Sequence, residues 1–286
     1  MSNGIYEYIE LSIESQLAIL TLKRPQALNA LTLEMLTELI SALDTVSASD
    51  SIRALLITGE GRGFCAGADL SGPSPSFERS DRDNQGQLTL ESMEKGFNLV
   101  ASKIYHMPKP VITAVNGAAA GAGVSIALAG DICIAGESGY FMQVFIPQLG
   151  IIPDMGATWL VPRLIGSARA RAAMLLGEKI DAKKAENWGL IYRVTADDQL
   201  MKTAKEYATK LAEGATFGIS QLKKVLDESG FNTFDQQLQL EAEVQKECCG
   251  SSDFVEGVMA FASKRKPEFT GEQHATSDRY PPTTDK

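Results

Sequence analysis

The chain has 286 residues, 44% of them hydrophobic, and its formal net charge at pH 7 is −9. Such a chain can bury one large core and add a helical extension, and the surplus of acidic residues argues against nucleic acid as its main partner. No apolar run is long enough to span a bilayer, and the first residues lack the basic-then-apolar pattern of a signal peptide. We therefore predict a cytoplasmic protein with neither a membrane nor a nucleic-acid partner.

The first half of the chain alternates strand-like and helical patterns. Strands are predicted over residues 16–22, 54–58, 111–115 and 131–135, and a helix over 32–46. Residues 71–87 are rich in Gly, Pro, Ser, Asp, Arg and Asn with almost no apolar side chains, which predicts a mobile loop. Such a loop would act as a lid over a site or be plainly disordered.

Two turns of small residues follow two of these strands, over 64–70 and 116–123, and each has the pattern of a strand, a turn and then a helix. Small residues let a ligand approach the main chain closely, and a helix N-terminus aims free N–H groups at an anion or a polarised carbonyl. Together the two turns could supply both donors of an oxyanion hole. The alternative is that they serve only the tight packing of a helix on a sheet.

One acid, Asp154, lies in an apolar segment over 149–158 that glycine and proline residues kink. A carboxylate in such surroundings loses hydration, so its pKa rises and it can accept and return a proton near neutral pH. The alternative role is an N-cap for a helix that begins near Met155, because Asp is a preferred residue at that position.

The cysteines and histidines do not form a recognisable site. The cysteines, Cys65, Cys133, Cys248 and Cys249, have neither metal-ligand spacing nor a disulfide framework. Cys65 is interpreted as a small packing residue although it lies in the first small-residue turn. The two histidines, His106 and His274, are far apart in the sequence. We therefore expect no metal and no Ser-His-Asp triad.

The second half of the chain is predominantly helical. Apolar residues recur three and four positions apart over 200–211, 220–228, 234–247 and 254–263. We predict a core over residues 1–200, a helical region over 201–270 that packs on the core and forms subunit contacts, and a disordered tail over 271–286.

Four segments together resemble signatures of the crotonase (enoyl-CoA hydratase/isomerase) superfamily, namely 22–31, 64–70, 116–123 and 150–158. The similarity extends over roughly residues 5–270. Within the superfamily it is greatest to the ring-1,2-epoxyphenylacetyl-CoA isomerases, through residues 152–154, 157–159, 216–218, 260–261 and 269–271. The resemblance implies an α/β fold with a ββα spiral core, a C-terminal helical trimerisation region, and a homotrimer or hexamer. It also implies an acyl-CoA thioester as the substrate, with coenzyme A as part of that substrate and no separate cofactor.

The resemblance assigns roles to individual residues. The backbone N–H groups of Ala68 and Ala122 correspond to the oxyanion hole. The residues that match coenzyme A contacts are Ala27, Leu28, Ala66, Gly67 and Asp69. Trp159, with Phe141, Met142, Phe145 and Met155, is a candidate for the acyl pocket or for simple core. Phe261 and Lys264 match residues that reach the coenzyme A of a neighbouring subunit, and the alternative is a packed Phe and a solvated Lys.

The anionic coenzyme A group requires a local basic patch in so acidic a chain. The candidates for it are Lys23, Arg24, Arg62, Lys264, Arg265 and Lys266.

Missing acids indicate which reaction the chain catalyses. The hydratases of the superfamily hold water with two glutamates, and here the first position is Ser125 while residues 141–150, which contain one extra residue, include no acid. Asp154 instead matches the single acid of the isomerases, which predicts a proton shuttle. Alternatives are a weakened hydratase, an aryl-CoA dehalogenase with Asp154 as nucleophile, and a non-catalytic acyl-CoA-binding protein. A dehalogenase needs a nearby histidine, and the sequence places His106 and His274 poorly for that role.

Overall fold

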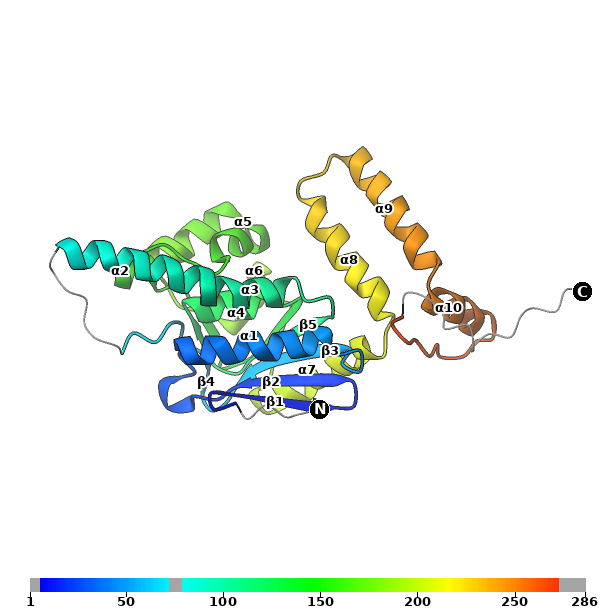
Figure 1. The fold of residues 1–286 in the computed structure, drawn as a ribbon, viewed down its shortest axis with the longest axis horizontal. Coiled ribbons are helices and arrows are strands. Elements are labelled where there is room, and N and C mark those ends of the chain that lie inside the picture. Colours follow the sequence, from blue (N-terminus) through cyan, green and yellow to red (C-terminus); the bar gives the residue numbers. More distant parts are fainter. Residues whose placement is uncertain (1–5, 72–78, 273–286) are drawn as a thin grey trace, which may run out of the picture.

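The computed structural model describes residues 6–71 and 79–272, which form an α/β body and a helical arm (Figure 1). The predicted tail from residue 273 onward and residues 72–78 of the predicted loop lie outside the described residues. Within the described ranges, no helix combines the length and apolar character needed to cross a membrane.

Two sheets form the body, and the chain coils between them. The first sheet has the order β1-β2-β3-β5-β7-β10 and the second the order β4-β6-β8-β9. Each of β3, β5 and β7 enters the first sheet, and the short strand that follows it, β4, β6 or β8, enters the second, which is a ββα spiral. All pairings are parallel except β1 with β2 and β8 with β9.

The strands have the following bounds: β1 Ile9–Glu14, β2 Leu17–Leu22, β3 Ala54–Gly59, β4 Gly63–Cys65, β5 Val111–Val115, β6 Ala118–Ala120, β7 Ile132–Gly136, β8 Tyr140–Met142, β9 Ile180–Asp181 and β10 Arg193–Thr195. The four predicted strands therefore correspond to β2, β3, β5 and β7. Each predicted strand overlaps its observed counterpart, because buried parallel strands are near-continuous apolar runs that the sequence shows directly.

The helices of the body are α1 Leu33–Ala48, α2 Arg79–Ser92, α3 Asn98–Tyr105, α4 Ala122–Ala129, α5 Ala157–Leu176 and α6 Ala182–Trp188. Three short helical turns accompany them, η1 Pro25–Ala27, the π-helical η3 Phe145–Leu149 and η4 Asp197–Gln199. The predicted helix over 32–46 is α1, and the side chain of Thr32 caps it by accepting a hydrogen bond from the Met35 N–H at 3.2 Å.

Helix α2 corrects the prediction of a loop over 71–87, because the chain is helical from Arg79. A π-helical turn, η2 Met93–Phe97, joins α2 to the packed helix α3. Extending an existing helix needs no costly nucleus and no apolar face of its own. Helix α2 therefore projects from the body as an exposed continuation of α3 (Figure 1), which its composition alone did not indicate.

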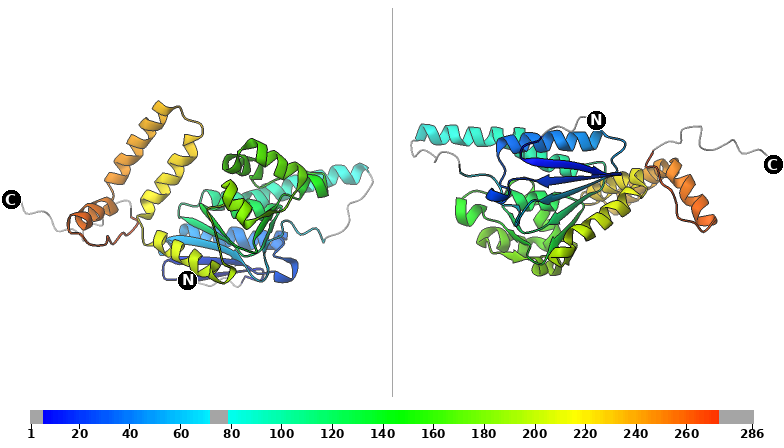
Figure 2. Two further views of the ribbon diagram at one scale, coloured as in Figure 1. Left: turned by 180° about the vertical axis from the view of Figure 1, so that it is seen from behind. Right: turned by 90° about the horizontal axis from the view of Figure 1, so that it is seen from below.

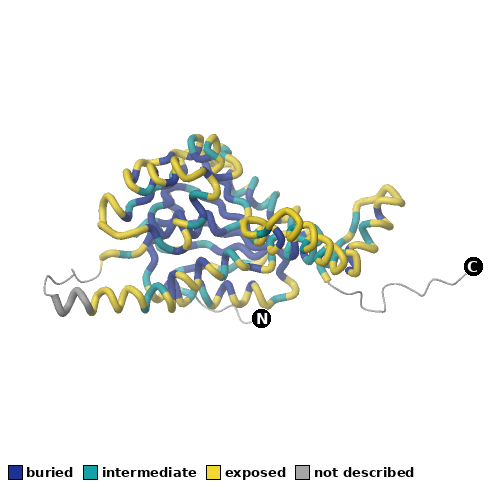
Figure 3. Tube along the Cα trace, turned by 90° about the horizontal axis from the view of Figure 1, so that it is seen from above, coloured by how far each residue is buried: buried dark blue, intermediate teal, exposed yellow. Residues whose placement is uncertain are grey.

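The first sheet is buried on both faces. Along β3, Leu55 and Ile57 pack into the cluster that α1, α3 and α4 cover, whereas Ala54 and Leu56 pack against α7, Leu200–Ala212. This alternation follows from the two-residue period of a strand. Figure 2 shows α1 and α7 on opposite sides of the sheet, and Figure 3 shows the buried positions concentrated in the body.

The arm follows α7 and consists of α8 Thr216–Ser229, α9 Phe234–Cys249 and α10 Ser252–Ala262, which correspond to the other three predicted helices. It extends away from the sheets and is largely exposed (Figures 1 and 3). The division of the chain at residue 200 stays a prediction.

Candidate active site

The two small-residue turns lie against each other. Strands β4 and β6 are parallel neighbours, so the turns that leave their carboxyl ends meet at one edge of the second sheet. A Cβ atom on Gly67 (φ 98°) would lie 3.0 Å from the carbonyl oxygen of Ala120 and 3.4 Å from the backbone nitrogen of Ala122. The fold therefore brings together the two segments that the sequence proposed as donors.

Only the second turn leads directly into a helix. Gly121, with φ 52°, precedes Ala122, the first residue of α4, whose N–H is among those that a helix leaves without an intrahelical partner. Helix α4 can begin here because Gly123 has no side chain. A Cβ atom at this position would lie 2.0 Å from the Cys65 carbonyl oxygen. Ala122 thus has the geometry of a backbone donor at a helix N-terminus.

Ala68 does not stand at a helix N-terminus, which corrects the predicted pattern of a strand, a turn and a helix. It forms an isolated parallel β-bridge with Leu31. The bonds of this bridge are made by its neighbours, because the Leu31 N–H donates to the Gly67 carbonyl at 2.8 Å and the Asp69 N–H donates to the Leu31 carbonyl at 2.9 Å. The Ala68 N–H takes no part in the bridge and points away from Leu31, as strand alternation requires.

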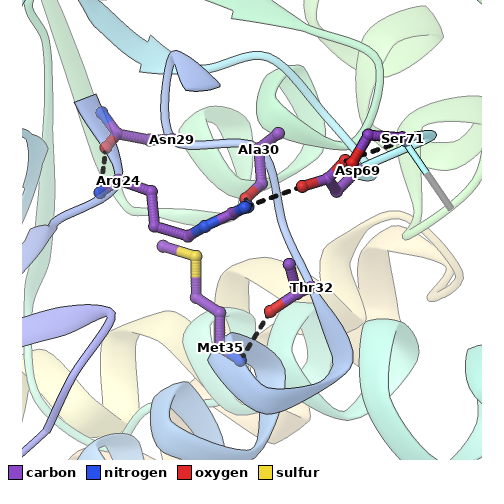
Figure 4. A network of polar contacts seen from close by, with 7 residues as sticks. All are labelled: Arg24, Asn29, Ala30, Thr32, Met35, Asp69 and Ser71. Atoms are coloured by element: carbon purple, nitrogen blue, oxygen red, sulfur yellow. Dashed lines mark hydrogen bonds and ion pairs between the residues drawn. The ribbon is translucent and has the colours of Figure 1, made fainter. Parts of the chain in front are cut away.

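The first turn is held to the 24–31 segment by an ion pair (Figure 4). Arg24 Nη2 lies 2.8 Å from Asp69 Oδ2, and Arg24 Nη1 donates to the Ala30 carbonyl. The other carboxylate oxygen of Asp69 accepts hydrogen bonds from the Ser71 hydroxyl at 2.6 Å and the Ser71 N–H at 2.9 Å. The bonds from Ser71, followed by the one from Arg24, lower the pKa of Asp69 to about 2, so this carboxylate is ionised and structural at neutral pH.

The two segments matched to coenzyme A lie side by side. The Ala66 N–H donates to the Leu28 carbonyl at 2.9 Å, which places Ala27 and Leu28 next to the first turn. Buried Asn29 supports this arrangement, because its side-chain amide donates to the carbonyls of Glu60 at 3.0 Å and Gly63 at 2.8 Å. Cys65 is fully buried, and burial raises the pKa of its thiol to about 12, in accordance with the packing role.

Asp154 lies beside the first turn of α4 and does not cap α5. The N-cap of α5 is Gly156 (φ 85°), and no side chain caps that helix, so the alternative of an N-cap is wrong. The backbone of Asp154 is anchored instead, since its carbonyl accepts hydrogen bonds from the Ser125 hydroxyl and the Ala157 N–H, each at 2.9 Å. Ser125 is one turn after Ala122, so the acid lies close to the proposed oxyanion donor.

Burial dominates the electrostatics of Asp154. The residue is half-buried between buried Pro153 and Met155, and its Oδ1 is buried without a hydrogen-bond partner among the described residues. Desolvation raises the pKa of this carboxyl group to about 6, and its own backbone N–H only partly offsets that rise. Met155 also has φ 50°, a conformation that is uncommon for a residue with a side chain and that recurs at functional sites.

A cavity of about 360 Å³ lies between α3 and α5, and Met155, Gly156 and Trp159 are among the residues that line it. Phe141 belongs to the core. Phe145 is buried, with its ring 3.7 Å from the position of a Cβ atom on Gly121.

The structure adds three polar residues of α3 and its C-cap that sequence reasoning did not assign, since Asn98, Ser102 and His106 line the same cavity. Their spacing of four positions is the signal that could have indicated one helix face. His106 therefore lines the same cavity as Met155 and Gly156. The sequence had led us to expect this histidine far from Asp154.

The C-terminal candidates lie far along the arm. Phe261, the penultimate residue of α10, is 88% exposed, so the alternative of a packed Phe is wrong for the single chain. The helix ends at Ala262, and Lys264 follows it with φ 51°.

Most of the basic candidates are committed to acids. The pairs are Lys23 with Glu10, Arg24 with Asp69, Arg265 with Glu256 and Lys266 with Glu213. Arg62 and Lys264 form no ion pair within the part of the chain that the structure describes. The same part contains no group of three His, Cys, Asp or Glu side chains arranged to hold a metal ion.

This fold and this sequence match known proteins. A family model described as enoyl-CoA hydratase/isomerase matches residues 12–273. The chain is 43% identical over 272 residues to the 1,2-epoxyphenylacetyl-CoA isomerase of Escherichia coli K12, in an alignment that covers 93% of this chain and 99% of that protein. The chain belongs to the enoyl-CoA hydratase/isomerase family.

Other proteins similar to this chain are named as isomerases or as hydratases. The trans-2-decenoyl-[acyl-carrier-protein] isomerase of Streptococcus mutans is 32% identical over 93% of this chain and 99% of its own length. The crystal structure of an enoyl-CoA hydratase from Polaromonas sp. JS666 matches with a TM-score of 0.83 and 34% identity over 91% of this chain and 99% of that one. An enoyl-CoA hydratase from Bacillus anthracis matches with a TM-score of 0.84 and 29% identity over 93% and 100%.

Membership of the enoyl-CoA hydratase/isomerase family confirms the predicted crotonase-like α/β fold with a C-terminal helical region. The similarity to an epoxyphenylacetyl-CoA isomerase is confirmed as well. The family assigns the chain to the hydratase/isomerase class of enzymes, and the choice between the two reactions depends on the side chains at the site.

Proposed function

We propose that this protein is an acyl-CoA isomerase that stabilises a thioester enolate with the N–H groups of Ala68 and Ala122 and shuttles a proton with Asp154. The observation that carries the proposal is the half-buried carboxyl group of Asp154, with Oδ1 unpartnered among the described residues, beside the first turn of α4. Burying an unpartnered carboxylate costs stability, and such groups concentrate at functional sites.

In the proposed mechanism, the two backbone donors stabilise the negative charge that develops on the thioester oxygen. Each donor contributes on the order of 3 kcal/mol to the transition state. Asp154 removes a proton from one carbon of the acyl group and returns it two carbons away, so the double bond moves by one position. One carboxylate suffices because it acts first as a base and then as an acid, and its buried neighbours Pro153 and Met155 limit the access of water.

The absence of a second acid favours isomerisation over hydration. In the hydratases that the chain resembles, a pair of glutamates activates water. Here Ser125 occupies the first position, and its hydroxyl is engaged with the Asp154 carbonyl. Residues 141–150, which include the π-helical turn η3, contain no acid at all. A water molecule at this site would lack the paired bases that hydration requires.

The proposed substrate is an acyl-CoA thioester, with coenzyme A along Ala27, Leu28, Ala66, Gly67 and Asp69 and the acyl group in the cavity beside Trp159. The names of the relatives include an aryl epoxide and a ten-carbon enoyl group as substrates of those proteins. For an epoxide, the same polarised thioester would assist ring opening and expansion to an oxepin. An enoyl thioester and a ring epoxide of phenylacetyl-CoA are therefore the two substrates to compare.

The proposal extends to the assembly. Phe261 and Lys264 would reach the coenzyme A of a neighbouring subunit in a homotrimer or hexamer, which the exposure of Phe261 supports. No separate cofactor takes part, and the cytoplasmic location stays a prediction.

The test is incubation with 3-hexenoyl-CoA and 2-hexenoyl-CoA in deuterated water, followed by mass spectrometry and absorbance. We expect interconversion of the two isomers by the wild type and a loss of about 10³-fold in Asp154→Asn, because the amide cannot accept the proton. The matched control is Asp44→Asn on α1, an exposed acid paired with Lys103, which should retain full activity.

Other outcomes would identify the alternatives. A 3-hydroxyacyl-CoA as the main product indicates a hydratase. Halide release from 4-chlorobenzoyl-CoA, with an ester trapped on Asp154, indicates a dehalogenase. Tight thioester binding without deuterium exchange, isomerisation or halide release indicates a non-catalytic acyl-CoA-binding protein. Undiminished deuterium exchange in Asp154→Asn contradicts the assignment of Asp154 as the base.

A further inference from the structure

Two cavities lie on either side of Trp159. The first, of about 360 Å³, is the one described above between α3 and α5. The second, also of about 360 Å³, lies between α5, the end of α4 and α8 of the arm. Four residues, Tyr105, Ala129, Trp159 and Leu160, line both cavities, so they form the wall that separates them.

Trp159 is the largest part of this wall, and its neighbours hold its ring in place. The edge of Tyr105 meets it with the ring centroids 5.5 Å apart, and the Arg163 guanidinium lies 3.8 Å from its centroid. Tyr105 is itself fixed, because its hydroxyl donates to the Asp227 carboxylate on α8. Removing the indole would leave Tyr105, Ala129 and Leu160 between the two cavities and would open the largest part of the wall.

The second cavity suits a hydrocarbon chain. Apart from the shared wall, most of its lining is aliphatic: Pro110, Leu128, Ile132, Leu164, Leu211, Ile219, Leu222 and Leu226. Each of its charged side chains has a partner. Lys223 donates to Asp131 at 2.9 Å, Asp227 accepts the Tyr105 hydroxyl, and Arg163 donates to the Trp159 carbonyl at 3.2 Å. An alkyl chain that entered would bury apolar surface against these side chains without breaking a polar contact.

We propose that Trp159 sets the maximum length of the acyl group, and that the cavity behind it is a second chamber for the distal carbons of medium-chain acyl thioesters. The inference rests on the proposed function, which places the acyl group in the first cavity. That cavity adjoins the proposed acid in the sequence, because Met155, which lines it, follows Asp154 directly. Ala129, which also lines it, shares one face of α4 with Ala122 and Ser125. In the wild type, the indole then confines the acyl group to a short chain or a single ring.

The test is a binding measurement, calorimetry with hexanoyl-CoA and decanoyl-CoA, which are saturated and cannot isomerise. In Trp159→Ala we expect the affinity for decanoyl-CoA relative to hexanoyl-CoA to rise about tenfold or more, because the extra methylene groups become buried. Trp159→Phe should give a smaller rise and provides a milder variant should Trp159→Ala fail to fold. The matched control is Trp188→Ala, because Trp188 also stacks against cationic side chains but is not among the residues lining either cavity.

A second substitution tests whether the gain comes from the second chamber. Leu164 lines only that cavity and is 42% exposed, so a larger side chain fits there without overpacking the core. Trp159→Ala with Leu164→Trp should return the affinity ratio to the wild-type value.

The outcomes separate this inference from the proposed function. An unchanged ratio in folded Trp159→Ala and Trp159→Phe overturns the second chamber, even where the wild type isomerises enoyl-CoA. A shifted ratio in a protein that isomerises nothing retains the chamber and removes the isomerase. An equal rise in Trp188→Ala also counts against the role of Trp159.

Discussion

At the scale of the residue, Asp154 shows how a protein can hold a carboxyl group near neutral pKa without a charged partner. Burial alone raises its pKa to about 6, while Ser125 and Ala157 fix its backbone through the carbonyl. Asp69 illustrates the opposite environment, where bonds from Ser71 and Arg24 lower the pKa to about 2. The two acids thus differ because Asp154 has a buried oxygen, Oδ1, without a hydrogen-bond donor among the described residues, whereas both oxygens of Asp69 accept hydrogen bonds.

The raised pKa of Asp154 predicts a pH dependence of catalysis. We expect kcat/KM for isomerisation to rise with pH through about 6 and then to level off, because only the ionised carboxylate accepts a proton. Steady-state rates measured across this range check the prediction. A rise in kcat/KM centred near the ordinary carboxyl pKa of 3.8 would contradict the burial argument.

The same shift predicts that Asp154→Asn stabilises the folded protein at neutral pH. The native pKa of about 6 lies above the unfolded value near 3.8, so the native state binds more protons between them and stability falls as pH rises through that window. Above pH 6 the wild type bears the full cost of the charged form, on the order of 1–2 kcal/mol after allowance for partial exposure. Urea unfolding below pH 4 and at pH 7 should show the difference only at the higher pH.

At the scale of the element, the start of α4 depends on close approach of two backbones. Gly123 lies against the Cys65 carbonyl at the end of β4, and this contact keeps the two proposed donor turns together. The ion pair between Arg24 and Asp69 adds a tie from the 24–31 segment. The second small-residue turn therefore serves helix–sheet packing as well as its proposed chemistry, so the two interpretations of that segment are not exclusive.

A pair of glycine substitutions tests this packing. Gly123→Ala should destabilise the protein by about 3 kcal/mol or more, because its Cβ would lie 2.0 Å from a carbonyl oxygen that cannot easily move. Gly86→Ala, on exposed α2, meets nothing within 4 Å and should stabilise by up to about 1 kcal/mol through helix propensity. Thermal and urea unfolding of both variants check the contrast, and similar effects at the two positions would exclude the steric explanation.

At the scale of the whole molecule, the arm leaves apolar side chains without cover in the single chain. Besides Leu222 and Leu226, which line the second cavity, the large exposed ones on and between α8, α9 and α10 are Phe231, Phe234, Leu238, Phe254, Val255, Val258, Met259 and Phe261. An apolar surface of this extent is typical of a subunit interface. It supports the proposal of a homotrimer or hexamer.

The oligomer can be tested by light scattering after size exclusion. We expect a mass of three or six chains for the wild type and smaller species for the triple substitution of Phe254, Val258 and Phe261 by Ser, which share one face of α10. The matched control replaces Leu88 and Leu90 of α2, also about half exposed, with Ser and should leave the mass unchanged. A wild type that is monomeric at micromolar concentration would contradict the proposal.

By itself, the sequence determined strands β2, β3, β5 and β7, helices α1 and α7, the helices of the arm, the two small-residue turns and the unusual setting of Asp154. These features are local, because periodicity, glycine placement and an acid among apolar residues are legible within a dozen positions. Only the tertiary structure decided that Gly156 rather than Asp154 is the N-cap of α5, that Ala68 lies in a β-bridge, and that Ser125 anchors the acid. It also decided that α2 is helical and that Trp159 separates two cavities. The reason is that each of these depends on which backbone groups and surfaces remain unpaired after distant segments pack, and no local pattern records that.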